Sequence, residues 1–103
     1  MLVAFSLAPS TSAEDGSVSD AVAEVVALVR ASGLPHRTDA MFTTVEGTWA
    51  EVTDLVGRCI DVLTARSPRV SLVLKADVRP GRTGELTGKL ERLEEAIDRL
   101  DRP

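Results

Sequence analysis

The sequence is poor in the residues that build disulfide frameworks and metal centres. It has one cysteine, Cys59, and one histidine, His36, among 103 residues. No internal disulfide can therefore form, and there is no Cys/His cluster with metal-ligand spacing. A lone cysteine is typical of a reducing compartment, so we expect a cytoplasmic protein with neither structural zinc nor another bound cofactor.

Basic residues and long apolar runs are also scarce. The 12 Lys and Arg are outnumbered by 16 Asp and Glu, which gives a net charge of -4 and no positive surface to hold nucleic-acid phosphates. The apolar opening MLVAFSLAP has no basic region ahead of it and is too short to span a bilayer. We expect no nucleic-acid partner and no membrane partner, and we interpret residues 2–9 as a strand that Pro9 ends.

Catalytic motifs are missing as well. The chain shows no nucleophile beside a base and no paired carboxylates at a catalytic spacing. It also shows no Gly-rich phosphate loop ahead of a helix. We therefore predict that the protein is not an enzyme.

The chain does contain a regular alternation of strand and helix patterns. Its length and 44% hydrophobic content suit one domain over residues 1–103. Valines at helical spacing predict a first helix that Ser17 or Ser19 caps and Gly33 ends: Val18, Val22, Val25, Val26 and Val29. Two short β-rich runs, 34–40 and 41–47, predict an antiparallel pair with a turn or bulge near Asp39 and Ala40.

The second half repeats this alternation and adds a helix. Thr48 and Glu51 form a capping-box pattern, and a helical apolar stripe follows: Val52, Leu55, Val56, Cys59 and Leu63. Residues 69–78 alternate as a strand, and 79–84 form a turn. A terminal helix carries an apolar seam of Leu86, Leu90, Leu93, Ile97 and Leu100. Because two heptads are short for a coiled coil, we expect this helix to dock on its own domain.

This order of elements predicts an α+β fold. It is the ferredoxin-like βαββαβ sandwich, in which two crossover helices cover one face of a four-stranded antiparallel sheet, with an additional C-terminal helix. Strict alternation places Val3, Phe5 and Leu7 toward the helices. The uncovered face then carries Leu2, Ala4, Ser6 and Ala8 together with Ser71, Val73, Lys75 and Asp77.

An uncovered face of this kind is poorly suited to water in a small domain. Packing against a second copy across a two-fold axis would cover it, so we expect a homodimer or homotetramer that assembles through the open sheet face. The small side chains of Ala4, Ser6 and Ala8 would leave a hollow there. Polar groups from Thr44, Glu46, Lys75 and Asp77 would line it, as a small-molecule site requires.

Several longer patterns resemble one family. They are SGLP at 32–35, M.T.VEG.W.EV from Met41 to Val52, RVS..LKAD.R.GRTG from Arg69 to Gly84, and KLERLEE from Lys89. With this spacing over nearly the whole chain, the sequence resembles the small thiamine-binding protein family. The resemblance implies a ferredoxin-like fold, dimers and commonly tetramers, and non-catalytic binding of thiamine or its hydroxymethylpyrimidine moiety. Phe42 stands where the family usually has glycine, and it would partly fill a pocket.

The site predicted from these patterns has eight ligand-binding residues: Ser6, Met41, Thr43, Thr44, Glu46, Ser71, Lys75 and Asp77. A carboxylate at Glu46 suits the paired donor edge of an aminopyrimidine. Structural alternatives are open for each residue. Glu46 could pair with Lys75 or interact with the helix terminus near Thr48. The hydroxyls suit any strand, and Met41 could fill the core. Lys75 and Asp77 could neutralise one another across an interface. The rival function is a structural or regulatory homo-oligomer without a ligand.

Overall fold

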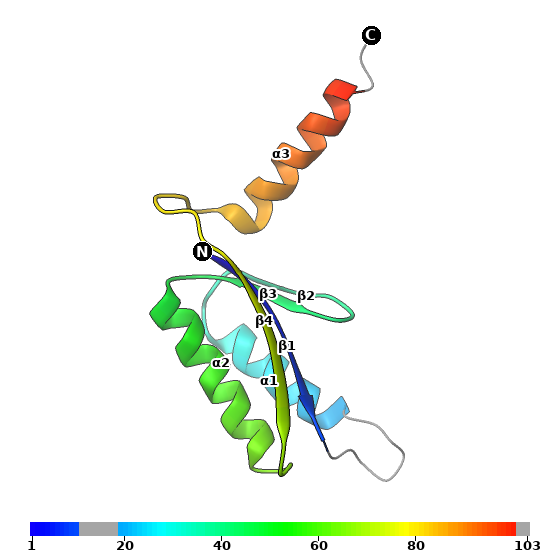
Figure 1. Cartoon of the computed structure of the whole chain (residues 1–103), viewed down its shortest axis with the longest axis vertical. Helices are drawn as coiled ribbons and strands as arrows, with labels where there is room; N and C mark the ends of the chain where they lie inside the picture. Colours follow the sequence, from blue (N-terminus) through cyan, green and yellow to red (C-terminus); the bar gives the residue numbers. More distant parts are fainter. Residues whose placement is uncertain (11–18, 101–103) are drawn as a thin grey trace.

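The computed structural model describes residues 1–10 and 19–100. Its elements are β1 (Leu2–Pro9), α1 (Ser19–Ala31), β2 (His36–Thr38), β3 (Thr43–Glu46), α2 (Trp49–Thr64), β4 (Val70–Asp77) and α3 (Glu85–Leu100). Figure 1 shows them in space. This is the predicted order of elements, and it confirms the ferredoxin-like α+β fold with an additional helix. Residues 11–18 lie outside the described residues. They include the predicted cap Ser17, the predicted apolar position Val18 and most of the predicted loop.

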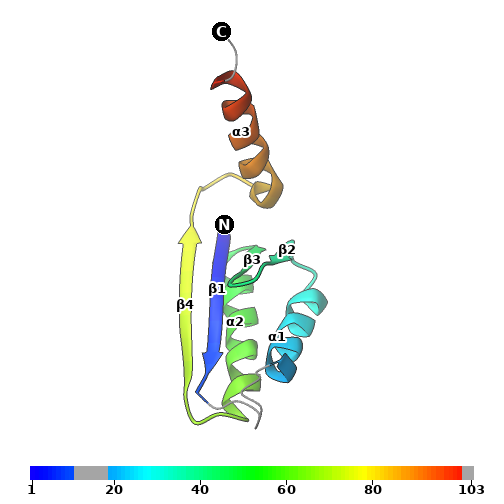
Figure 2. The same cartoon turned by 90° about the vertical axis from the view of Figure 1, so that its right-hand side faces the viewer.

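The sheet has the strand order β2-β3-β1-β4, and every neighbouring pair is antiparallel. β1 is central, with Val3 opposite Val45 of β3 and Phe5 opposite Leu74 of β4. α1 and α2 lie together on one face of the sheet (Figure 2). Since neighbouring side chains alternate between faces, this register fixes which residues meet the helices and which do not.

Local signals define the helix ends where they were expected. The Thr48 side chain accepts a hydrogen bond from the Glu51 amide, and the Glu51 carboxylate accepts one from the Thr48 amide at 3.0 Å. Both orphan donors at the start of α2 are thereby satisfied. After α1, Gly33 adopts a φ of 77°, a left-handed conformation that glycine enters without a steric penalty. Trp49 starts α2 and is exposed.

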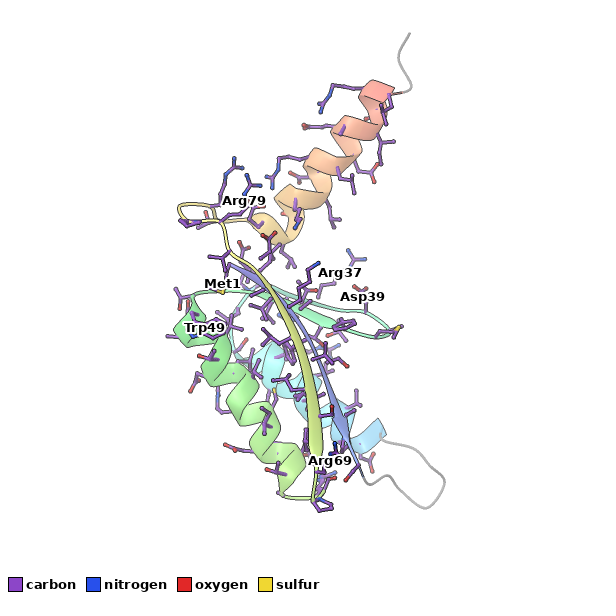
Figure 3. All side chains as sticks on the ribbon, viewed as in Figure 1. Met1, Arg37, Asp39, Trp49, Arg69 and Arg79 are labelled. Carbon is purple, nitrogen blue, oxygen red and sulfur yellow. The ribbon has the colours of Figure 1, made fainter. Side chains whose placement is uncertain are left out.

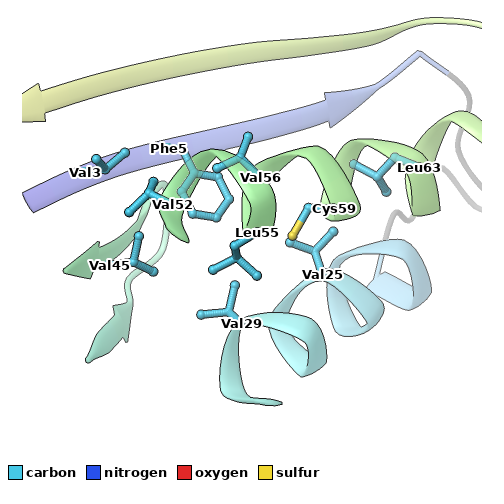
Figure 4. Close-up of a cluster of buried hydrophobic side chains, with 10 residues drawn as sticks. All are labelled: Val3, Phe5, Val25, Val29, Val45, Val52, Leu55, Val56, Cys59 and Leu63. Carbon is cyan, nitrogen blue, oxygen red and sulfur yellow. The ribbon is translucent and has the colours of Figure 1, made fainter. Parts of the chain in front are cut away.

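The core lies between the sheet and these two helices (Figure 4). It consists of Val3, Phe5, Val25, Val29, Val45, Val52, Leu55, Val56, Cys59 and Leu63. Every apolar position predicted for α2 is included. Burying each large side chain contributes about 1.5–3 kcal/mol relative to water, so this cluster is the main source of stability for the domain.

The expectation that α3 docks along its own domain is wrong. Only its first turns lie against the sheet, and the rest of the helix extends away from the domain (Figures 1 and 2). Leu90, Leu93 and Ile97 are 48%, 54% and 41% exposed. The prediction failed because an apolar seam shows that a helix has a face to bury, but not which surface covers it. Among the described residues, none of the helices is long and apolar enough to cross a membrane.

Candidate functional site

The open face of the sheet has the composition that alternation predicted. The strand register places Glu46, Leu2 and Asp77 in one row across β3, β1 and β4. Thr44, Ala4 and Lys75 form the next row. Ser6 lies beside Val73, and Ala8 beside Ser71. Residues in a row have neighbouring side chains, so all the predicted open-face residues share one surface.

Glu46 is at the end of this face where α3 begins. Its carboxylate accepts hydrogen bonds from the amides of Glu85 at 2.8 Å and Leu86 at 3.4 Å. The residue is 9% exposed. A carboxylate at a helix N-terminus satisfies free N–H groups and interacts favourably with the helix dipole. Glu46 therefore does interact with a helix terminus, as one of the alternatives expected. The helix is α3, and not the one that begins near Thr48.

Two ion pairs extend this attachment of α3. Arg92 contacts the carboxylate of the buried Glu85 at 2.5 Å, and Arg82 approaches it at 3.9 Å. The hydrogen bond from Arg92 lowers the pKa of Glu85. Lys89 contacts Asp77 at 2.5 Å, and this hydrogen bond lowers the pKa of Asp77. Both carboxylates are thus held in the charged form beside the first turns of α3.

A cavity of about 340 Å³ lies between these turns and the open face. We call it the helix cavity, and its lining is Leu2, Arg37, Asp39, Thr44, Glu85, Leu86, Lys89 and Leu90. Of the predicted ligand-binding residues, Thr44 is the one that lines it. The lining combines leucine side chains with charged groups, which suits a small amphipathic molecule.

A second cavity, of about 200 Å³, lies at the edge of the sheet. It forms where β3 begins at Thr43 while β1 continues to Pro9, so the end of β1 has no neighbour on that side among the described strands. We call it the edge cavity. Its lining includes Ser6, Met41 and Thr43 of the predicted site, together with Asp39, Phe5 and Phe42. The remaining lining residues are mainly aliphatic side chains of α1 and β1.

The eight predicted residues are therefore divided among four places. Three line the edge cavity, Thr44 lines the helix cavity, and Glu46 and Asp77 are engaged with α3. Ser71 and Lys75 are exposed on β4. Phe42 lines the edge cavity and not the helix cavity. That Phe42 partly fills a pocket stays a prediction.

Sequence reasoning did not identify Arg37 and Asp39. Both are on the β2–β3 hairpin (Figure 3), Arg37 lies 3.3 Å from Asp39, and Asp39 lines both cavities. The hairpin was predicted, but its three-residue β2 strand leaves the register ambiguous in the sequence. The only usable signal was an oppositely charged pair two residues apart, which is common on exposed strands.

Within the described residues there is neither a cluster of metal ligands nor an exposed thiol. No group of three or more His, Cys, Asp or Glu side chains there is placed to hold a metal ion. Cys59 is buried in the core, and the loss of solvent raises the pKa of its thiol. A buried thiol of this kind is a poor nucleophile.

Comparison with known proteins identifies the family. Residues 3–94 match the family model described as thiamine-binding protein. The chain belongs to this thiamine-binding protein family. Two relatives are UPF0045 protein Mb1933 of Mycobacterium bovis and UPF0045 protein MT1949 of Mycobacterium tuberculosis. Each is 50% identical over 95 residues, which is 91% of this chain and 91% of the relative.

Solved structures agree with the ferredoxin-like fold of this thiamine-binding protein family member. The hypothetical protein MJ1052 of Methanocaldococcus jannascii has a TM-score of 0.80 at 24% identity, covering 91% of this chain and 95% of that chain. A Thermotoga maritima protein described as a candidate thiamine biosynthesis/salvage protein has a TM-score of 0.72 at 24% identity, covering 87% and 96%. At this identity the likeness establishes the fold.

Proposed function

We propose that this protein is a non-enzymatic, cytoplasmic binder of thiamine or its hydroxymethylpyrimidine moiety, with a site at the interface of a homodimer or homotetramer. Membership of the thiamine-binding protein family supports the ligand class. The observation that carries the proposal is the edge cavity, where Ser6, Met41 and Thr43 come together. All three are residues that the sequence patterns predict for the site.

The chemistry of the edge cavity suits a single polar aromatic ring. The thioether of Met41 and the ring of Phe42 are surfaces on which a flat heterocycle packs. Ser6 and Thr43 provide hydroxyl groups, and the Asp39 carboxylate can accept hydrogen bonds from an exocyclic amine. At about 200 Å³, the cavity is smaller than a typical ligand pocket. In this proposal it holds the pyrimidine ring, and a second copy encloses the rest of the ligand.

The other predicted residues have supporting roles in this proposal. Thr44 lines the helix cavity, while Ser71 and Lys75 are on the part of the open face that the second copy covers. Direct binding by Glu46 or Asp77 stays a prediction, and it requires each carboxylate to exchange a contact with α3 for a contact with the ligand.

Isothermal titration of the purified protein with thiamine and with hydroxymethylpyrimidine tests the proposal. We expect binding heat at ligand concentrations of roughly 100 µM, where a micromolar Kd gives near saturation. Ser6→Leu fills the edge cavity and should abolish the heat. Ala50→Leu is the control, because it enlarges an exposed side chain on α2, away from the open face and from the lining of either cavity. Absence of heat with both ligands, or equal loss in both variants, would overturn the proposal.

The rival function is a structural or regulatory homo-oligomer that binds no ligand. The observations in its favour are that the bulky side chain of Phe42 lines the edge cavity and that the Glu46 carboxylate accepts a hydrogen bond from the start of α3. It predicts that Ser6→Leu and Glu46→Ala change association or stability, while neither small molecule alters the melting temperature of the wild-type protein.

A further inference from the structure

Glu46 is a buried carboxylate that is balanced by a helix end and not by a cation. Within the described residues it accepts hydrogen bonds from the amides of Glu85 and Leu86, and it is 9% exposed. The other carboxylates around the first turns of α3 each have a cation beside them: Asp39 has Arg37, Asp77 has Lys89, and Glu85 has Arg92. A helix start supplies only about half of an elementary positive charge. A full positive charge would therefore balance Glu46 better.

The start of α3 depends on Glu46 because the helix has no side-chain cap of its own. Gly84 precedes the helix, and its carbonyl accepts the first helical hydrogen bond, from the Gly88 amide at 2.9 Å. Gly84 thus occupies the N-cap position, where it has no side chain to offer. In contrast, α2 is capped locally by Thr48. If Glu46 changes partner, the amides of Glu85 and the next residue lose their acceptor.

The connection to α3 permits a movement of this helix. Gly81 and Gly84 lie between β4 and α3 with φ values of 77° and 68°, and glycine has access to more backbone conformations than any other residue. Beyond its first turns the helix projects from the domain (Figure 1), and Leu93 and Ile97 are 54% and 41% exposed. The attachment of α3 therefore consists largely of polar contacts near its start, and few buried apolar contacts oppose its release.

The helix cavity lies directly beside the two amides that hold Glu46. Both Glu85 and Leu86 line it, as does Leu2, which is opposite Glu46 in the β1–β3 register. Its volume of about 340 Å³ is within the range of small-molecule pockets. Asp39 lines this cavity and the edge cavity, so the two adjoin. A ligand with its first ring in the edge cavity can place a second ring in the helix cavity.

We propose that α3 is a lid on the helix cavity, and that a ligand with a cationic ring opens it by taking the Glu46 carboxylate from the amides of Glu85 and Leu86. Ligand binding and helix docking then compete for one carboxylate, and the ligand shifts the population toward a released helix start. The inference rests on the proposed function, since thiamine carries a permanent positive charge on its thiazolium ring. The free hydroxymethylpyrimidine has no such ring and would leave the lid closed.

Amide hydrogen exchange followed by NMR tests the lid in the full-length protein. Saturating thiamine should accelerate exchange at the amides of Glu85 and Leu86, because both lose their acceptor. Hydroxymethylpyrimidine is the control ligand and should leave both rates unchanged. A ligand that packs beneath a docked helix would instead slow the exchange. Unchanged or slower exchange at both amides while thiamine is bound overturns the proposal.

Glu46→Gln tests the need for a negative charge. The variant keeps a carbonyl acceptor for the two amides, but it cannot pair with a cationic ring. The ligand loses a full opposite charge and the helix only a partial one, so the thiamine Kd should rise by roughly fivefold or more, the low end of usual coupling between two binding equilibria. The hydroxymethylpyrimidine Kd should stay the same. Glu95→Gln is the matched control, since it removes the same charge from an exposed position of α3. Equal thiamine affinity in all three proteins contradicts the proposal.

The outcomes separate this inference from the proposed function. Binding heat that Ser6→Leu abolishes, without faster exchange at Glu85 and Leu86 in the wild-type protein, supports the proposed function and overturns the lid. Faster exchange with thiamine in Ser6→Leu as well supports the lid and overturns the role of the edge cavity, because Ser6 lines only that cavity. Absence of heat with both ligands overturns both.

Discussion

Glu46 connects the sheet to α3 through main-chain hydrogen bonds. Replacing it with alanine leaves the amides of Glu85 and Leu86 without their acceptor. We expect Glu46→Ala to lower the free energy of unfolding by about 1.5–3 kcal/mol, the usual contribution of a hydrogen bond to a charged group. Urea denaturation measures this loss, and amide hydrogen exchange should show faster exchange at Glu85 and Leu86.

Glu46→Gln is the matched control for that variant. The amide side chain has nearly the same shape and keeps one carbonyl acceptor, but it loses the charge that interacts with the helix dipole. Its destabilisation should be smaller than that of Glu46→Ala. Equal exchange rates at Glu85 and Leu86 in all three proteins would show that the carboxylate does not hold α3.

At the same scale, the sequence predicted the place of Glu46 but not its partner. Its position at the end of β3, beside a glycine, follows from the local pattern. The amide of Glu85 is 39 residues away along the chain, and no periodicity connects the two. The place of Asp39 could not be predicted for the same reason. Asp39 lines both cavities because of how a short hairpin turns.

Among the elements, α3 is attached through ion pairs that depend on pH. Ion pairing lowers the pKa of Glu85 and of Asp77 below their unfolded values. Such groups stabilise the attached helix above the unfolded pKa, near 4, and this contribution is lost as the pH falls through the folded pKa. We expect stability measured in urea to be level from pH 7 to about pH 5 and to fall below that.

The double variant Asp77→Asn with Glu85→Gln tests the origin of that fall. It should show a shallower loss of stability between about pH 5 and pH 3, because the two carboxylates beside α3 with lowered pKa values are absent. Glu95→Gln is the control, since it removes an exposed carboxylate from the same helix. If the control flattens the pH profile as much as the double variant does, the ion pairs at the first turns of α3 are not the cause.

The elements themselves were largely predictable, because their signals are local. The capping box of α2 and the alternation of β4 were found in the sequence and are present in the structure. β2 was shorter than its β-rich run indicated, with three residues. The position of α3 was predicted incorrectly, because the seam of α3 and the apolar faces of α1 and α2 look alike in the sequence. Their difference depends on which surface each helix meets in the fold, and the sequence of a helix does not specify that surface.

For the whole molecule, the structure separates a packed domain from a projecting helix. The principal extents are 57 × 31 × 20 Å, and the buried cluster lies entirely in the domain. Leu55→Ala should therefore cost about 2–5 kcal/mol, since Leu55 is fully buried and its truncation leaves a cavity. Leu93→Ala changes the same residue type on α3, where half of the side chain is exposed, and should cost less than about 1 kcal/mol.

Thermal or urea unfolding of the two variants measures this contrast. Both should be compared at one protein concentration, because association of copies adds to apparent stability. A large loss for Leu93→Ala would mean that α3 is packed in solution against a surface that a single chain does not show.

The central position of β1 has a consequence for how the protein folds. β1 precedes the other described strands in the chain, yet one of its two partners is β4, whose paired residues are 61 to 75 positions later. Contacts of such long range raise contact order and slow folding. During synthesis the second edge of the apolar β1 stays unpaired until β4 has been made. We therefore expect that folding intermediates with an exposed β1 are the species most prone to aggregation and the natural clients of chaperones.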